Sequence, residues 1–136
     1  MKAWLLALLA LAACGAEVAE GPPPAKALQV NQPGGNVALQ QVLVPDYVTI
    51  VDFWSASCGA CAIVGGKVEA GIADQPRVIL RKVDVGDGFT PVAQTFDIVA
   101  LPHFNVYDRK RRLRYILIGN DCLRAPQLAR ELSAED

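Results

Sequence analysis

The sequence predicts an α/β domain, and three observations support that prediction. Segments rich in β-branched and aromatic residues alternate with segments whose apolar residues recur at helical spacing. A Cys-Gly-Ala-Cys pair at residues 58–61 directly follows the strongest strand-like run, Tyr47 to Trp54. About 100 residues remain after the N-terminal segments, enough for one hydrophobic core but not two. The elements follow the order β-α-β-α-β-β-α, which is typical of an α/β sandwich.

Residues 1–13 have the features of a secretory signal. Lys2 precedes an apolar stretch from Ala3 to Ala13 that is too short to span a bilayer and ends in small residues. The Leu-Ala-Ala-Cys sequence ending at Cys14 resembles the lipobox of bacterial lipoproteins, which implies cleavage before Cys14 and its acylation. The alternative is an ordinary cleavable signal in which Cys14 is incidental. We expect a lipid-anchored protein of the bacterial cell envelope, facing the periplasm or the cell exterior.

Residues 14–36 are expected to tether the domain, residues 37–136, to that anchor. They contain Gly21-Pro22-Pro23-Pro24 and Pro33-Gly34-Gly35 and have no apolar period. Such a tether would hold the domain on the order of 25–50 Å from the membrane surface. The whole chain has 13 basic and 14 acidic residues, which excludes a general polyanion-binding surface. We therefore expect no nucleic-acid partner, and separately we expect a monomer.

The first half of the domain contains the clearest strand and the clearest helix. Val37 to Val44 fits either a strand or a short helix. Tyr47 to Trp54 is apolar on both faces except at Asp52, as a central strand should be. From Gly59 to about Ala73 the apolar spacing predicts a helix. Gly65-Gly66 lies within it, and two glycines cost about 1 kcal/mol each relative to alanine, so this helix should be soft or closely packed there.

The second half adds a strand, a short helix, a hairpin and a closing helix. Arg77 to Val85 is the expected strand, and Thr90-Pro91 supplies an N-cap and a first-turn proline for a helix ending near Phe96. The last three elements are expected at His103–Tyr107, Leu113–Ile118 and Pro126–Leu132. The charged run at 108–112 between the two strands is typical of a hairpin tip that discourages edge-to-edge aggregation.

The two cysteines of the C-x-x-C pair indicate thiol chemistry. Cys58 is expected in the first turn of the helix, where unpaired N–H groups and the helix dipole favour a thiolate. Cys58 would then attack and Cys61 would resolve the mixed disulfide. Half a zinc site has the same spacing. Only His103, Cys122 and carboxylates remain as further ligands in the mature chain, which disfavours structural zinc.

Several segments together resemble the thioredoxin family. The run Val-Asp-Phe-Trp-Ser-Ala-Ser-Cys-Gly-Ala-Cys at 51–61 is similar to its active-site segment. Lys82-Val83-Asp84-Val85 resembles its third core strand, Ala100-Leu101-Pro102 its cis-proline loop, and Gly119 the glycine that ends its last strand. The resemblance covers roughly residues 37–133 and implies a thioredoxin fold, with a central mixed sheet flanked by helices.

The resemblance implies a thiol–disulfide oxidoreductase that needs no cofactor or metal and whose Cys58 and Cys61 form the redox disulfide. Asp52 would lie beneath Cys61 and accept its proton, because a carboxylate in so apolar a strand is costly unless used. The alternative is a carboxylate at the end of the sheet, facing water. Pro102 is expected in the cis form against the cysteines, with Leu101 and Gly119 contacting substrate.

Three further residues are expected to modulate the site. Lys82 matches the lysine that neighbours the aspartate in the family, and an exposed lysine at a strand edge is the alternative. His103 follows Pro102 and is the only histidine, so it would adjust thiolate charge near neutral pH. Trp54 is expected to be a core residue close to the disulfide. Cys122 would be a small buried residue, or else the site of a regulatory or intermolecular disulfide.

The expected activity is disulfide exchange with protein thiols or disulfides, more in the direction of reduction. Ser57, Ala60 and His103 replace the family's tryptophan, proline and threonine, and such residues determine thiol pKa and potential. A reductase outside the cytoplasm implies a transmembrane thiol donor. The alternatives are a Cu(I)-handling protein that uses Cys58, Cys61 and His103 as ligands, and a non-catalytic interaction module. A cis-proline against the thiols disfavours the copper alternative.

Overall fold

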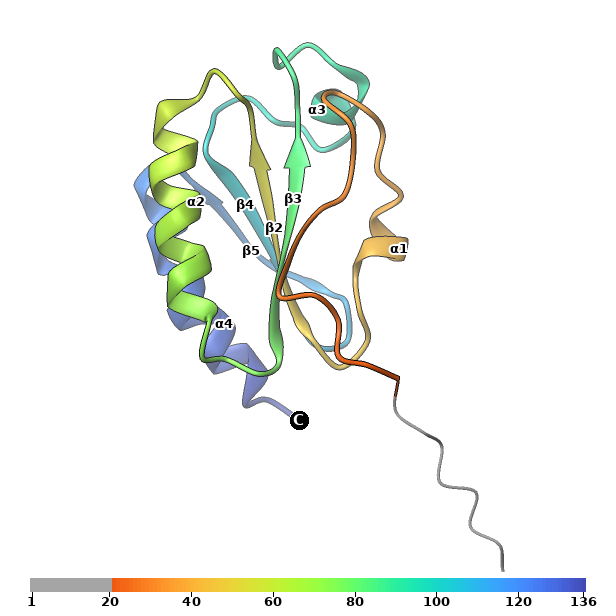
Figure 1. The fold of residues 1–136 in the computed structure, drawn as a ribbon, viewed down its shortest axis with the longest axis vertical. Coiled ribbons are helices and arrows are strands. Elements are labelled where there is room, and N and C mark those ends of the chain that lie inside the picture. Colours follow the sequence, from red (N-terminus) through yellow and green to blue (C-terminus); the bar gives the residue numbers. More distant parts are fainter. Residues whose placement is uncertain (1–20) are drawn as a thin grey trace, which may run out of the picture.

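The structure is a computed structural model that describes residues 21–136 (Figure 1). The expected signal peptide and Cys14 lie outside the described residues. In chain order the elements are β1 (Ala27–Gln29), α1 (Leu39–Val42), β2 (Val48–Trp54), α2 (Gly59–Ile72), β3 (Val78–Asp84), α3 (Pro91–Thr95), β4 (His103–Tyr107), β5 (Leu113–Ile118), the 3-10 helix η1 (Gly119–Arg124) and α4 (Ala125–Ser133). No helix among residues 21–136 is long and apolar enough to cross a membrane.

The five strands form one mixed sheet in the order β1-β3-β2-β4-β5. Strands β1 and β2 run parallel to β3, whereas β4 runs antiparallel to both β2 and β5. Helices α2 and α4 cover one face, and α1 and α3 lie on the other (Figure 1). The predicted α/β class and the mixed sheet flanked by helices are therefore confirmed.

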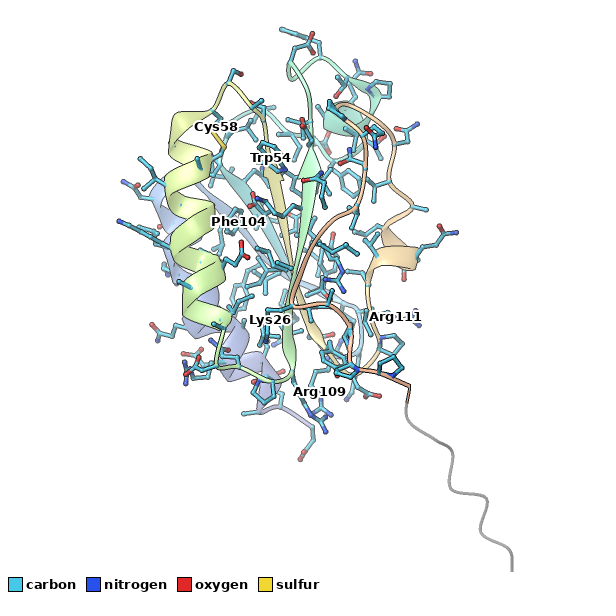
Figure 2. All side chains as sticks on the ribbon, viewed as in Figure 1. Lys26, Trp54, Cys58, Phe104, Arg109 and Arg111 are labelled. Carbon is cyan, nitrogen blue, oxygen red and sulfur yellow. A yellow bond between two sulfur atoms is a disulfide. The ribbon has the colours of Figure 1, made fainter. Side chains whose placement is uncertain are left out.

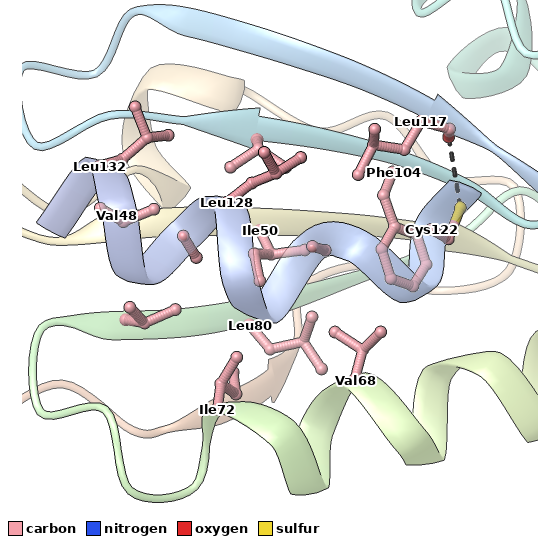
Figure 3. Close-up of a cluster of buried hydrophobic side chains, with 14 of the residues drawn as sticks. Val48, Ile50, Val68, Ile72, Leu80, Phe104, Leu117, Cys122, Leu128 and Leu132 are labelled. Carbon is pink, nitrogen blue, oxygen red and sulfur yellow. Dashed lines mark hydrogen bonds between the residues drawn. The ribbon is translucent and has the colours of Figure 1, made fainter. Parts of the chain in front are cut away.

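Strand β2 separates two apolar clusters, as its hydrophobicity on both faces predicts. Val48 and Ile50 belong to the cluster under α2 and α4, whereas Val51 and Phe53 belong to the cluster on the side of α1 and α3. Figure 3 shows the first cluster, whose labelled members are Val48, Ile50, Val68, Ile72, Leu80, Phe104, Leu117, Cys122, Leu128 and Leu132. Asp52 follows the same alternation and lies on the side of α2, beside Cys61.

The N-terminal part of the described chain differs from the expected tether. Strand β1 lies within the segment 14–36 and pairs with β3, with Ala27 opposite Leu80. The Lys26 ammonium donates hydrogen bonds to the carbonyls of Gln75 and Val78, the latter at 2.8 Å. A three-residue edge strand is too short to produce a detectable period, which is why residue patterning does not reveal it. The segment 37–44, which fitted a strand or a helix, contains the short helix α1.

The predicted hairpin tip is tied to the C-terminal end of the chain. The Asp108 carboxylate accepts hydrogen bonds from Arg112 at 2.8 Å and Arg114 at 3.2 Å. Burial alone would raise the pKa of Asp108, but these bonds and backbone N–H donors lower it to about 2. Arg114 also forms an ion pair with Glu135 at 2.7 Å. Arg109 of the charged run donates a further hydrogen bond of 2.8 Å to the carbonyl of Glu135, so the hairpin holds the residues after α4.

Candidate active site

Cys58 and Cys61 form a disulfide at the start of α2, as the resemblance implied (Figure 2). Cys58 is the N-cap of the helix, and its sulfur accepts a hydrogen bond from the Cys61 N–H at 3.1 Å. Free N–H groups of the first turn and the helix dipole stabilise negative charge at this position. Cys58 is half-buried, whereas Cys61 is only 3% exposed. A partner protein therefore reaches the sulfur of Cys58 more easily than that of Cys61.

A pocket of about 590 Å³ lies beside Cys58. Its walls come from three segments, which are Ser55–Cys58, Val85–Phe89 and Ile98–Leu101. The Leu101–Pro102 peptide bond is cis, as expected. Phe89 and Val99 are 86% and 88% exposed, which makes part of the rim of this pocket apolar. Sequence reasoning missed these two residues, although a phenylalanine in a glycine-rich loop is a signal of exposed apolar surface.

Gly119 supports the cis-proline loop through its backbone. Its N–H donates a hydrogen bond of 2.9 Å to the carbonyl of Pro102. Its φ of +62° lies in the left-handed region, which glycine adopts without steric cost. Leu101 lines the pocket beside Cys58, but Gly119 does not. The expectation that both residues contact substrate thus has geometric support for Leu101, whereas the described contact of Gly119 is with Pro102.

Asp52 is buried on the face of the sheet that α2 covers, and the alternative of a carboxylate facing water is wrong. Its side chain is 1% exposed, and burial raises its pKa to about 7. The positive charge of Lys82 acts against this rise, and the negative charge of Glu69 adds to it. Oδ1 has no hydrogen-bond partner among residues 21–136. Asp52 and Cys61 line a common pocket of about 110 Å³.

Lys82 and Trp54 also line this smaller pocket. The Lys82 nitrogen lies 5.1 Å from the centre of the Trp54 ring, within the range of a cation–π contact. The indole N–H of Trp54 donates a hydrogen bond of 3.0 Å to Gln29 of β1. Trp54 is half-buried, so the expectation that it is a core residue is wrong. The ring instead lies at the end of β2, between β1 and the pocket.

His103 packs on the other face of the sheet. Its ring is edge-on to Phe53, with centroids 5.5 Å apart, and Phe53 points away from the side of Asp52. Its Nε2 forms a hydrogen bond of 3.0 Å with Asn105, and burial lowers its pKa. Although His103 directly follows Pro102, its side chain is part of the cluster around Phe53. The expectation that it adjusts thiolate charge has no support in this geometry.

The copper alternative depended on the same histidine. No group of three His, Cys, Asp or Glu side chains in the described part of the chain is arranged to hold a metal ion. His103 packs against Phe53, and Cys61 lies in α2 on the opposite side of the sheet. The three residues predicted to bind Cu(I) are therefore not brought together, which is a correction to that alternative.

Cys122 is fully buried in η1, in the cluster under α2 and α4 (Figure 3). Its thiol donates a hydrogen bond of 3.3 Å to the carbonyl of Leu117. Burial, together with the nearby charge of Asp52, raises the pKa of this thiol to about 12. The interpretation as a small buried residue is confirmed, and a disulfide to another protein would require Cys122 to leave the core.

Comparisons with known proteins agree with this geometry. A family model described as Thioredoxin matches residues 36–123. A thioredoxin of Malassezia sympodialis is 35% identical over 85 residues, which are 60% of this chain and 78% of that protein. The crystal structure of a thioredoxin from the same organism superposes with a TM-score of 0.60 at 26% identity, and the match covers 85% of this chain and 99% of that one.

A mutant thioredoxin from Halobacterium salinarum has a TM-score of 0.65, and the match covers 86% of this chain and 99% of that one. Its identity of 20% indicates likeness in fold alone. The family model, by contrast, matches more than half of the chain by sequence and includes the disulfide-forming pair. The chain therefore belongs to the thioredoxin family, a family of thiol–disulfide oxidoreductases that act on protein thiols or disulfides.

Proposed function

We propose that this thiol–disulfide oxidoreductase works as a reductase of partner proteins outside the cytoplasm, held at the membrane by a lipid on Cys14. The observation that carries the catalytic part is the difference in exposure across the first turn of α2. The N-cap sulfur of Cys58 borders the 590 Å³ pocket, whereas Cys61 is buried beside Asp52. One sulfur is therefore accessible to a partner, and the other is adjacent to a proton acceptor.

The reaction has two covalent steps. In the reduced protein the Cys58 thiolate attacks a disulfide of the partner, forms a mixed disulfide and releases one partner thiolate. Cys61 then loses its proton to Asp52, and its sulfur attacks the Cys58 sulfur and releases the second partner thiolate. The partner gains two electrons, and the protein is left with the Cys58–Cys61 disulfide. Leu101 borders the pocket in which the partner segment would meet Cys58, and the cis peptide bond to Pro102 fixes the direction of the chain there.

Asp52 suits the second step because of its environment. Burial raises its pKa to about 7, so the carboxylate accepts a proton and returns it to water within the neutral pH range. The charge of Lys82 keeps a fraction of the carboxyl ionised despite its burial. Lys82 thus acts on the site through the charge of Asp52, and Trp54 acts by lining the pocket beside Asp52.

The direction and the location are supported by the sequence. The Cys-Gly-Ala-Cys pair and Leu101 stay close to the thioredoxin pattern, which favours reduction. The Leu-Ala-Ala-Cys sequence before residue 15 favours a lipid anchor. An anchored reductase receives no electrons from the cytoplasm directly, so its partner on the donor side is a transmembrane protein with a redox-active thiol pair. Its partners on the acceptor side are protein disulfides in the cell envelope.

The redox potential of the Cys58–Cys61 pair tests the direction. The protein is equilibrated in buffers of defined thiol–disulfide ratio, and the free thiols are then trapped and counted. A potential near the roughly −270 mV of thioredoxins supports reduction, whereas one near the approximately −120 mV of strong periplasmic oxidants contradicts it. The Cys122→Ser variant, which keeps the pair, should give the same potential.

A further inference from the structure

The pocket of about 110 Å³ beside Asp52 links a buried carboxyl to the outside of the molecule. It is lined by Asp52, Trp54 and Lys82 of the sheet and by four residues of α2, which are Cys61, Ala62, Gly65 and Gly66. Lys82 and Trp54 are half-buried and Ala62 and Gly66 are exposed, so the pocket lies between Asp52 and solvent. One water needs only about 10–15 Å³ of such space, and the pocket therefore has room for several.

Gly65 approaches Asp52 more closely than a residue with a side chain ordinarily would. A Cβ at residue 65 would lie 3.1 Å from the Oδ2 atom of Asp52, closer than an ordinary van der Waals contact. Asp52 is fixed on a central strand and is 1% exposed, so it has little freedom to retreat. The next residue is different, because a Cβ at Gly66 would meet no heavy atom within 4 Å. Only the first glycine of the pair is in a tight contact.

We propose that Gly65 is a positioning residue for Asp52, and that its missing side chain keeps the carboxyl in contact with pocket water. This inference rests on the proposed function, in which Asp52 takes the proton of Cys61. The proton leaves the Cys61 sulfur, which keeps the electron pair and attacks Cys58. The Asp52 carboxylate accepts the proton and passes it through the pocket water to solvent. No electron is exchanged in this proton transfer.

The charged and titratable groups around Asp52 come from α2, β3 and η1, and in the reduced protein they include the Cys61 thiol of α2. Lys82 faces it from β3 and favours the carboxylate, whereas Glu69 of α2 favours the neutral acid. Cys122 of η1 is close enough for the charge of Asp52 to affect its thiol. A methyl group at residue 65 changes none of these groups. It replaces water beside Oδ2 with hydrocarbon, which disfavours the charged carboxylate and moves its titration to higher pH.

The test compares Gly65→Ala with Gly66→Ala, because both add one methyl group and both raise the helix propensity of α2. Reduced protein is mixed with 5,5′-dithiobis(2-nitrobenzoate), and the release of thionitrobenzoate is followed from pH 5.5 to pH 9. Attack by Cys58 releases the first equivalent and resolution by Cys61 releases the second. Gly65→Ala should slow the second release on the order of tenfold at pH 7 and move its pH profile upward. Its first release should stay within about twofold of the wild type. Gly66→Ala also adds a methyl group to the lining of this pocket, but that group does not approach Asp52, so it should slow the second release less than Gly65→Ala does.

The effect must depend on Asp52 if Gly65 acts through it. In an Asp52→Asn background, Gly65→Ala should therefore cause no further slowing of the second release. Slowing of the same size in both backgrounds would overturn the proposal, and so would a folded Gly65→Ala protein with the pH profile of the wild type. If Gly65→Ala does not fold, Ala62→Leu narrows the same pocket from an exposed position. An unchanged second release in Ala62→Leu would then overturn the water route.

Failure of the proposed function gives a different result from failure of this inference. A wild type without a first release would lack disulfide exchange through Cys58 altogether. A wild type with both releases, matched at every pH by Gly65→Ala, would leave the proposed function intact and remove only the role of Gly65.

Discussion

Asp52 and Lys82 lie directly opposite each other on the parallel strands β2 and β3. Burial raises the pKa of Asp52 to about 7, and the charge of Lys82 keeps it from rising further. The lysine in turn lies over the ring of Trp54, 5.1 Å from its centre. A strand pairing thus keeps a buried carboxyl near the midpoint of its titration at neutral pH, where a proton acceptor for a thiol is most effective.

Asp52→Asn should stabilise the folded protein, and more so as the pH rises. The folded pKa of Asp52, about 7, lies above its ordinary value of 3.8, so the folded state binds more protons than the unfolded state between these values. Wild-type stability therefore falls as pH rises from about 4 to about 7, by up to about 4 kcal/mol. Urea unfolding at pH 4 and pH 8 measures this. A wild-type minus variant difference that is the same at both pH values would contradict the prediction.

Lys82→Met should slow resolution by Cys61 at neutral pH. Removing the positive charge opposite Asp52 raises the pKa of its carboxyl above about 7, so that less carboxylate is present to take the proton. The pH profile of the resolving step should move to higher pH by up to about one unit, which is tenfold at most at pH 7. Lys67→Met, at an exposed lysine of α2, is the matched control. A profile that moved to lower pH would oppose this assignment.

Cys58→Ser should abolish disulfide exchange, whereas Cys61→Ser should still attack and then accumulate mixed disulfides with partner proteins. The reason is that Cys58 is the more accessible sulfur and lies at the helix N-terminus. Non-reducing gels and mass spectrometry of trapped complexes distinguish the two variants. Faster alkylation of Cys61 than of Cys58 in the reduced protein would reverse these roles.

Cys122 should resist alkylation in the folded protein. Its thiol is fully buried and its pKa is raised to about 12, so almost none of it is thiolate at pH 8. Iodoacetamide should label Cys58 of the reduced protein within minutes and Cys122 only after unfolding. Peptide mass spectrometry with and without guanidinium checks this. Equal labelling in both conditions would mean that η1 opens readily.

Cys14→Ala should release the protein from membranes or leave its signal uncut. The expectation rests on the Leu-Ala-Ala-Cys sequence after the apolar stretch. Cell fractionation and determination of the mature N-terminus test it, with Cys122→Ser as a control that removes a different cysteine. A wild-type protein found only in the soluble fraction, with an N-terminus other than Cys14, would rule out the lipid anchor.

The parts of the fold that the sequence predicted are those with strong periods or distinctive residue pairs. Strand β2 is apolar on both faces, α2 has regularly spaced apolar residues, and the C-x-x-C pair marks their junction. Strand β1 has three residues and an exposed edge, so its position depends on pairing with β3, which local sequence does not encode. The later elements are all longer than β1, and longer elements carry a clearer residue pattern. The sequence therefore predicted most of the order of elements.

Side-chain direction was harder to predict than position. His103 is adjacent to Pro102 in the chain. The face of the sheet on which its side chain lies is determined by the register with β2, in which His103 lies opposite Phe53. Trp54 is the last residue of β2 and lies at the edge of the core, so the alternating pattern of the strand does not decide whether its ring is buried. The ring is positioned by a hydrogen bond to Gln29 of β1, the strand that the sequence did not predict. The helix was expected to be soft or closely packed at Gly65-Gly66. The 3.1 Å between a Cβ built at residue 65 and the Oδ2 atom of Asp52 shows close packing at Gly65.

Strand β1 also determines how an anchored protein would face the membrane. Because β1 runs parallel to β3, the chain enters the sheet at the end where β3 begins, and Cys58 lies at the opposite end, after β2 (Figure 2). A lipid on Cys14 would leave the 11 residues 15–25 before Lys26, a tether of at most about 40 Å when fully stretched. With so short a tether the disulfide would lie on the side of the domain away from the anchor, and a membrane-embedded electron donor would need a domain that extends well above the lipid surface to reach it.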